Sequence, residues 1–168
     1  IKRDFQGKGV HTLIYNATSS KFATFEECSV EDFEASMASG PTGLFRIVKI
    51  LVPDMVEAGE GVIGVTGATA SWRGVPNTTC LAPAKFAMRA LCQSFARQYT
   101  PKGVHVFHAI IDGMVDLPMS RGWMPDKPTD EWIQAADVAE SYYSTAHQPR
   151  SCWTTEYNIF AHGAGGGH

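Results

Sequence analysis

Residues 61–101 read GVIGVTGATASWRGVPNTTCLAPAKFAMRALCQSFARQYTP, and this stretch decides the fold. The apolar run at Val62, Ile63 and Val65 predicts a buried strand over residues 61–66. A polar segment with glycine and proline at 68–79 then predicts a loop. Beyond the loop, apolar side chains recur at helical spacing, which predicts a helix that ends before Pro101. Open α/β sheets bind their ligands where a strand runs through such a loop into a helix.

Three further segments on either side of this unit have the pattern of strands. Residues 10–17 form an apolar run, residues 103–111 are rich in β-branched side chains, and residues 151–160 alternate in polarity. Helical patterns separate these segments, so the sequence predicts an α/β fold.

The helical segment after residue 29 carries two local signals. Ser29 stands three residues before Asp32, which predicts a helix start with the two side chains as reciprocal caps. The Gly40-Pro41 pair lies inside the apolar face and predicts a kink or break. Later in the chain, residues 115–128 have the composition of a loop, and residues 129–132 and 136–147 have that of two helical stretches.

Composition excludes several classes of function. The net charge is -3 and no run of lysine or arginine occurs, so we expect no nucleic-acid partner. No apolar stretch reaches membrane-spanning length, so we expect no membrane partner, and the four scattered cysteines favour a reduced, cytoplasmic setting. The Gly-Lys-Gly segment at 7–9 lacks the spacing of a phosphate loop. His105 and His108 fall on opposite faces of their strand, so no metal site is expected.

Residues 61–74 and 84–113 together resemble the second half of a short-chain dehydrogenase/reductase, and the resemblance extends over about residues 10–160. It implies a three-layer, Rossmann-like α/β fold with a mostly parallel sheet. The predicted strands correspond to family strands four to seven, and family strands one to three are missing. Residues 10–17 and 61–66 should then be parallel neighbours. We expect one partial domain over residues 1–162, followed by a flexible Gly-rich tail at 163–168.

The resemblance also implies a catalytic set, which this sequence retains in part. Lys85 matches the family lysine, whereas the family tyrosine position holds Leu81 and the family serine position holds Ala68. Thr69 and Ser71 lie near enough in sequence to take over the serine's role, so Lys85, Thr69 and Ser71 are the candidate catalytic residues. A leucine cannot move a proton, so we expect a degenerate site.

For the cofactor, the resemblance implies NAD or NADP. The candidate cofactor-binding residues are the ends of two strands and the helix lysine, namely Asn16, Ala17, Lys85, Asp112 and Gly113. The glycine-rich loop of the family would follow a strand that is absent here, so we expect weak binding or none. Residues 115–128 correspond to the family segment that covers a small-molecule substrate.

Two functions remain open from the sequence. The first is an NAD(P)-dependent oxidoreductase for a carbonyl or alcohol, with impaired or no activity as the chain stands. The second is a non-catalytic binding or assembly module. For both functions we expect a homo-oligomer, either a dimer or a tetramer. It would form through the long helices or through the strand at 10–17. The free edge of that strand should pair with another chain or be covered by another segment.

Overall fold

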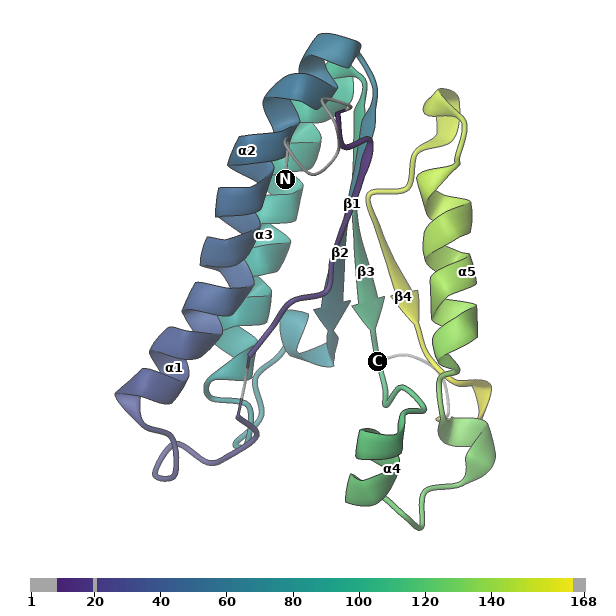
Figure 1. Cartoon of the computed structure of the whole chain (residues 1–168). Coiled ribbons are helices and arrows are strands. Elements are labelled where there is room, and N and C mark those ends of the chain that lie inside the picture. The colour runs from purple at the N-terminus through teal and green to yellow at the C-terminus, as the bar shows by residue number, and fades with distance from the viewer. Residues whose placement is uncertain (1–8, 20, 165–168) are drawn as a thin grey trace.

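The computed structural model describes residues 9–19 and 21–164 and contains one parallel sheet (Figure 1). Its strands lie side by side in chain order, so each strand pairs with the next one in sequence. Thr12 pairs with Val62 in the first ladder, which confirms the predicted parallel neighbours. The four strands are β1 (Thr12–Tyr15), β2 (Gly61–Ala68), β3 (Val104–Ile111) and β4 (Glu156–Ile159).

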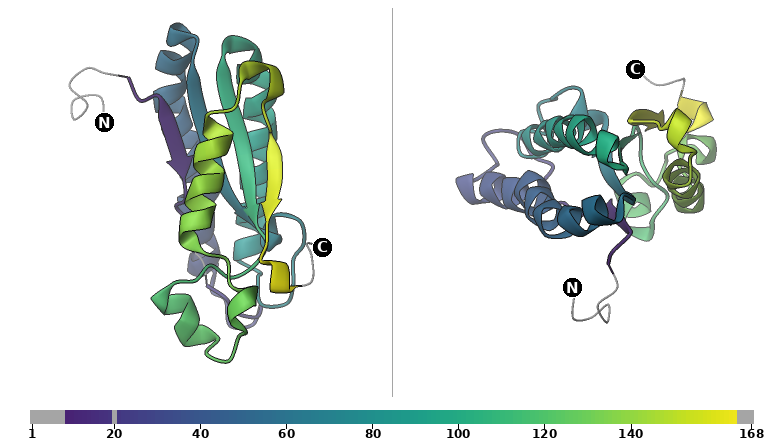
Figure 2. Two further views of the ribbon diagram at one scale, coloured as in Figure 1. Left: turned by 90° about the vertical axis from the view of Figure 1, so that its right-hand side faces the viewer. Right: turned by 90° about the horizontal axis from the view of Figure 1, so that it is seen from above.

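Helices cover both faces of this sheet and make three layers (Figures 1 and 2). On one face lie α1 (Val30–Met37), α2 (Gly43–Ala58) and α3 (Leu81–Tyr99). On the other face lies α5 (Ala135–Ala146). The short helix α4 (Pro118–Trp123) lies beyond the carboxyl ends of the strands (Figure 1). The predicted three-layer, Rossmann-like α/β fold is therefore confirmed.

The two faces of the sheet carry separate hydrophobic cores. Along β2, Ile63 and Val65 pack toward α2 and α3, whereas Val62 packs in the cluster on the α5 side. Every residue of β3 is buried, as a central parallel strand covered on both faces requires. Burial on both faces explains why the sequences of β2 and β3 are mostly apolar on both sides of the strand.

The signals in the first helical segment are confirmed, with one refinement. The Ser29 hydroxyl accepts from the Asp32 amide at 3.1 Å, and the Asp32 carboxylate accepts from the Ser29 amide at 3.0 Å. At the Gly40-Pro41 pair the chain makes a π-helical turn, Ala38–Thr42, and α2 continues from it. The turn brings Gly40 against α3, where an added Cβ would lie 3.3 Å from the Met88 sulfur.

Several boundaries differ from those expected. The strand β1 spans Thr12–Tyr15 rather than residues 10–17, and β2 continues to Ala68 rather than ending at residue 66. The segment 115–128 contains α4, because Pro118 suits a first helical turn and the Ser120 hydroxyl accepts from the Leu117 amide at 3.0 Å. The last strand is only four residues long, Glu156–Ile159, because residues 150–152 form a 3₁₀ turn. Residues 165–168 of the expected tail, and residues 7 and 8 of the Gly-Lys-Gly segment, lie outside the described residues. Among the helices of the described part, none is long and apolar enough to cross a membrane.

Candidate functional site

The polar residues of the candidate site gather at the carboxyl edge of the sheet. Asn16 follows β1, Thr66 and Ala68 end β2, and Asp112 follows β3. These strands are parallel neighbours, so their ends meet at the edge where open α/β sheets bind ligands. The structure thus brings together residues that lie almost one hundred positions apart in sequence.

Lys85 reaches this edge from the first turns of α3. Its side chain is only 3% exposed, and Nζ donates to the carbonyl oxygen of Thr66 at 2.8 Å. Burial lowers the pKa of Lys85 to about 8. The ammonium form is still the major one at neutral pH, but it is held in a site that disfavours its charge. A buried lysine at a strand edge is a hallmark of functional sites more than of scaffolds.

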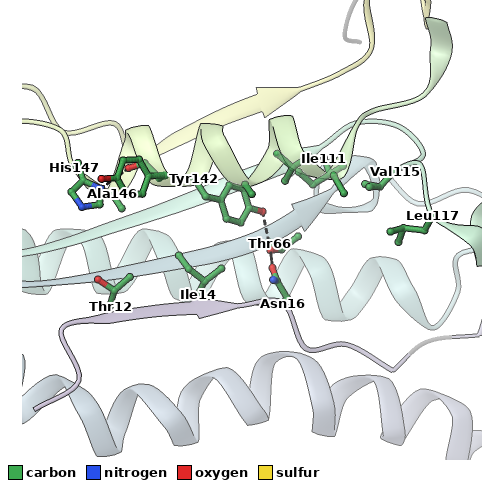
Figure 3. A pocket seen from close by; sticks show the side chains of 14 residues that line it. Thr12, Ile14, Asn16, Thr66, Ile111, Val115, Leu117, Tyr142, Ala146 and His147 are labelled. Carbon is green, nitrogen blue, oxygen red and sulfur yellow. Dashed lines mark hydrogen bonds between the residues drawn. The ribbon is translucent and has the colours of Figure 1, made fainter. Parts of the chain in front are cut away.

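A chain of hydrogen bonds runs from β1 to α5 through Thr66 (Figure 3). The Thr66 hydroxyl donates to Asn16 Oδ1 and lies 2.8 Å from the hydroxyl of Tyr142. Burial raises the pKa of Tyr142 to about 12, so this phenol stays protonated at neutral pH. Thr66 is therefore hydrogen-bonded to Asn16 and Tyr142 through its side chain and to Lys85 through its backbone carbonyl.

This chain lies on the wall of a pocket of about 600 Å³ between the sheet and α5 (Figure 3). Apart from Asn16, Thr66 and Tyr142, its walls near the strand ends are apolar. The apolar side chains there are Ile14, Ile111, Val115 and Leu117. A mostly apolar pocket with a few convergent polar groups is the usual form of a small-molecule site.

The positions that correspond to the family tyrosine and serine are both apolar and lie together. Leu81 is the first residue of α3 and is 6% exposed. It clusters with Ala70 and Ala82, and Ala68 packs against the same cluster. The structure therefore joins Leu81 and Ala68, as the resemblance requires, but neither side chain can exchange a proton.

The two hydroxyls proposed to replace the serine have different surroundings. Ser71 is fully buried, and its Oγ accepts from the Ala68 amide at 3.1 Å. Thr69 is half-buried, and its Oγ1 donates to Asp112 Oδ1 at 2.5 Å. Thr69 is thus partly accessible at the end of β2, whereas Ser71 is buried and supports the turn.

The remaining candidates flank this edge. Ala17 is exposed just after β1. Gly113 adopts a positive φ of 155°, and an added Cβ would lie 3.0 Å from Ile133 Cδ1. A side chain at residue 113 would be strained, so the glycine keeps the backbone after Asp112 close to the following segment.

Sequence reasoning missed a buried network behind the site. His108 is 1% exposed, and its Nδ1 lies 3.0 Å from Glu156 Oε2. Arg89 donates to both oxygens of Glu156, at 2.8 and 2.6 Å. Burial acts to raise the pKa of Glu156, but the hydrogen bonds from Arg89 and His108 hold it below the usual value. The available signal was the pair of histidines, His105 and His108, in a strand whose other residues are apolar.

Burial lowers the pKa of His108, so the imidazole is neutral near pH 7. Since Nδ1 faces a carboxylate, it carries the proton, and Nε2 is then a bare acceptor. Within the described residues Nε2 has no hydrogen-bond partner. It points at Gly67, which has no side chain to block it.

The architecture is that of a Rossmann-like α/β protein with a parallel sheet, and comparison with known proteins gives its family. A family model described as short chain dehydrogenase matches residues 1–128. The chain belongs to this family.

Relatives and solved structures agree with this assignment. A 3-alpha-(or 20-beta)-hydroxysteroid dehydrogenase of Mycobacterium tuberculosis is 30% identical over 118 residues, which are 70% of this chain and 45% of the relative. A 2-(R)-hydroxypropyl-CoM dehydrogenase of Xanthobacter autotrophicus is 29% identical over 142 residues, which are 83% of this chain and 56% of the relative. The chain spans about half the length of the curated relatives that it matches.

Among solved structures, a short-chain dehydrogenase from Rhodopseudomonas palustris is 30% identical with a TM-score of 0.74, over 92% of this chain and 63% of that one. An NAD+-bound xylitol dehydrogenase has a TM-score of 0.81 over 95% of this chain and 70% of that one. At 18% identity the second likeness shows the fold alone.

Proposed function

We propose that this chain provides the strand-end half of a nicotinamide site in an NAD(P)-dependent oxidoreductase that acts on an alcohol or a carbonyl. The observation that carries the proposal is the buried ammonium of Lys85, held at the end of β2 by the Thr66 carbonyl at 2.8 Å. An ammonium there suits the ribose hydroxyls of a nicotinamide nucleotide, because each hydroxyl oxygen can accept one of its N–H bonds.

The surrounding residues fit such a ligand. Lys85 Nζ carries three N–H donors, and in the described part of the chain one of them donates to the Thr66 carbonyl oxygen. Asn16 and Thr66 line the adjoining pocket, and its apolar walls suit an aromatic ring. A bound nicotinamide would supply or accept the hydride, while Lys85 would hold and orient it at the strand ends. The NAD+ bound to the xylitol dehydrogenase relative is consistent with this proposal.

We propose further that turnover is impaired in this chain. The family residue that gives and takes the hydroxyl proton is replaced by Leu81, and the residue that holds the carbonyl oxygen is replaced by Ala68. General acid–base catalysis contributes about 10²- to 10⁴-fold to such a rate. Binding of the cofactor depends on Lys85 rather than on the phenol, so we expect binding to outlast catalysis.

A titration with NADH and with NADPH, followed by nicotinamide fluorescence, tests the proposal. We expect saturable binding of one or both by the wild type, and a dissociation constant at least about tenfold higher for Lys85→Ala, a loss of about 1.4 kcal/mol. The matched control is Lys49→Ala, which removes an exposed lysine of α2 and should leave the dissociation constant unchanged. Absence of saturable binding, or equal constants for the two variants, would contradict the proposal.

A second candidate function is a binding or assembly module without catalysis. The outer side of α2 supports it, because Phe45 and Ile50 are 47% and 51% exposed. Phe45 also lines a groove of about 420 Å³ between α2 and α3. We propose that this face, or the free edge of β1, joins two copies of the chain. Sedimentation velocity of wild type and Phe45→Glu tests this candidate, since a dimer formed there should dissociate in the variant. A wild-type monomer at all concentrations would exclude it.

A further inference from the structure

A hydroxyl and a carboxylate face each other across the ends of β2 and β3. Ala68 and Ile111 are the last paired residues of these strands, so Thr69 and Asp112 are the next residue on each. The Thr69 hydroxyl donates to Asp112 Oδ1 at 2.5 Å. This distance is within the range of a charge-assisted O–H···O⁻ hydrogen bond, about 2.5–2.7 Å, which is among the stronger kinds in proteins.

The two groups are exposed to different degrees. Asp112 is 9% exposed, and its amide donates to the carbonyl of Ile159 at 2.8 Å, so the strand end is fixed to β4. Thr69 is half-buried, and its carbonyl accepts from the Trp72 amide at 3.0 Å in the turn that leaves β2. An accessible hydroxyl therefore lies in front of a sheltered carboxylate, and both are held by backbone contacts.

The backbone that leads into and out of the pair carries the carbonyl that Lys85 binds and a residue that lines an apolar cavity. Lys85 binds the carbonyl of Thr66, three residues before Thr69. Two residues after Asp112, Met114 lines a pocket of about 650 Å³ together with Phe22 and Trp123.

We propose that Thr69 and Asp112 form the proton-transfer pair of this site, in place of the phenol that Leu81 lacks. This inference rests on the proposed oxidoreductase function. In alcohol oxidation, Thr69 Oγ1 accepts the hydroxyl proton of the substrate while its own proton passes to Asp112 Oδ1. An oxidised nicotinamide, when bound, would accept the hydride as the C–H bond breaks, and the C–O bond would become a carbonyl. The products are the carbonyl compound, the reduced nicotinamide and a protonated Asp112, which returns its proton to water through Thr69.

The roles of the two residues differ. Thr69 touches the reacting oxygen and is the catalytic residue of the pair. Asp112 acts through Thr69, so it is a positioning residue that orients the hydroxyl and receives the proton. Thr69→Ser keeps the hydroxyl group, whereas Thr69→Val keeps the shape of the side chain without the hydroxyl. Asp112→Asn keeps the shape of the side chain without the carboxylate.

The kinetic test uses the full chain with NAD+ and NADP+ and a panel of secondary alcohols, together with the cofactor titration above. We expect Thr69→Ser to retain kcat/KM within a few-fold, and Thr69→Val and Asp112→Asn to lose at least about a hundredfold. The loss should fall on kcat, with the cofactor dissociation constant unchanged. The controls are Thr42→Val, in the π-helical turn before α2, and Asp137→Asn, in α5, because both residues are exposed. Wild-type rates in Thr69→Val or in Asp112→Asn would overturn the proposal.

A second readout does not depend on turnover. Trifluoroethanol, an alcohol that resists oxidation, is titrated by fluorine NMR with and without cofactor. We expect the wild type and Thr69→Ser to bind it alike, and Thr69→Val and Asp112→Asn to bind it at least about tenfold more weakly. Thr69→Val removes the partner of the alcohol's hydroxyl group, and Asp112→Asn removes the carboxylate that orients that partner. Equal affinity in all four proteins would overturn the proposal.

The two readouts separate this inference from the function on which it rests. Saturable cofactor binding without turnover of any alcohol, or with turnover that Thr69→Val retains, overturns the proton-transfer pair and leaves the nicotinamide site standing. Absence of cofactor binding overturns the proposed function. In that case trifluoroethanol binding without cofactor still decides whether Thr69 and Asp112 recognise an alcohol.

Discussion

Gly67 is the position where the buried imidazole of His108 comes closest to the backbone of β2, and Gly67→Ala tests that packing. An added Cβ would overlap Nε2 of His108, lie 2.6 Å from its Cε1 and stand 3.1 Å from Ser71 Oγ. The imidazole cannot swing away freely, because its Nδ1 is bound to Glu156, which is held in turn by Arg89. We therefore expect the new methyl group to destabilise the fold.

The expected magnitude combines two opposing effects. Inserting a methyl group into a packed interior costs about 1–3 kcal/mol. Alanine in a strand is favoured over glycine by about 0.5–1 kcal/mol, because less backbone entropy is lost on folding. The net loss in the free energy of unfolding for Gly67→Ala should be about 1 kcal/mol, within a range of about 0–2.5 kcal/mol.

Urea denaturation of four proteins measures this loss and its cause: wild type, Gly67→Ala, His108→Ala and the double variant. If the overlap with the imidazole is the cause, the two substitutions should couple by at least about 1 kcal/mol, with His108→Ala relieving part of the penalty. Gly74→Ala is the matched control, because its nearest neighbour, Ala82 Cβ, would be 3.8 Å away. Equal unfolding midpoints for Gly67→Ala and Gly74→Ala, or a coupling near zero, would refute the reasoning.

Three further predictions concern the charged and apolar groups of the site. Lys85 has a pKa of about 8 in the folded protein, against 10.5 for an unperturbed lysine, so the unfolded chain binds more protons between pH 8 and 10.5. Stability should therefore rise by up to about 3 kcal/mol across this range. Urea titrations should show that rise in the wild type but not in Lys85→Met. Glu156→Gln should lower stability by about 1–2 kcal/mol, because it weakens a half-buried ion pair with Arg89. Asp116→Asn should change the urea midpoint less, because its partner Arg121 is 40% exposed, against 29% for Arg89. Leu81→Tyr combined with Ala68→Ser should raise alcohol turnover at least about tenfold if cofactor binds, and an unchanged rate would show that these positions do not face the reacting oxygen.

The sequence predicted the parts of the fold that depend on local patterns. The strands β2 and β3 are buried on both faces, so their apolar runs are long and were recognised. The cap at Ser29 is a local pairing with Asp32 and was recognised for the same reason. The helix α4 was missed because its six residues hold a proline, a glycine and an exposed tryptophan, which gives no apolar period to detect.

The contacts that build the site depend on register, which the sequence does not reveal. Thr69 and Asp112 meet because Ala68 pairs with Ile111, and a shift of one residue in that ladder would separate them. The link between His108 and Glu156 likewise depends on their pairing in the ladder of β3 with β4. Such contacts became visible only when the strands were aligned in space.

The ammonium of Lys85 is the strongest argument that the site binds a ligand. Its pKa of about 8 means that the fold disfavours its charge, by up to about 3 kcal/mol relative to a lysine in water. The described residues offer it the Thr66 carbonyl, a neutral acceptor, and the neighbouring positions that could have held a phenol or a hydroxyl are Leu81 and Ala68. An apolar side chain at position 85 would fill this space at a lower cost, as replacement of buried charges in other proteins indicates. A ligand that brings acceptors to the remaining N–H groups would offset this cost, so we infer that Lys85 is better explained by binding than by folding.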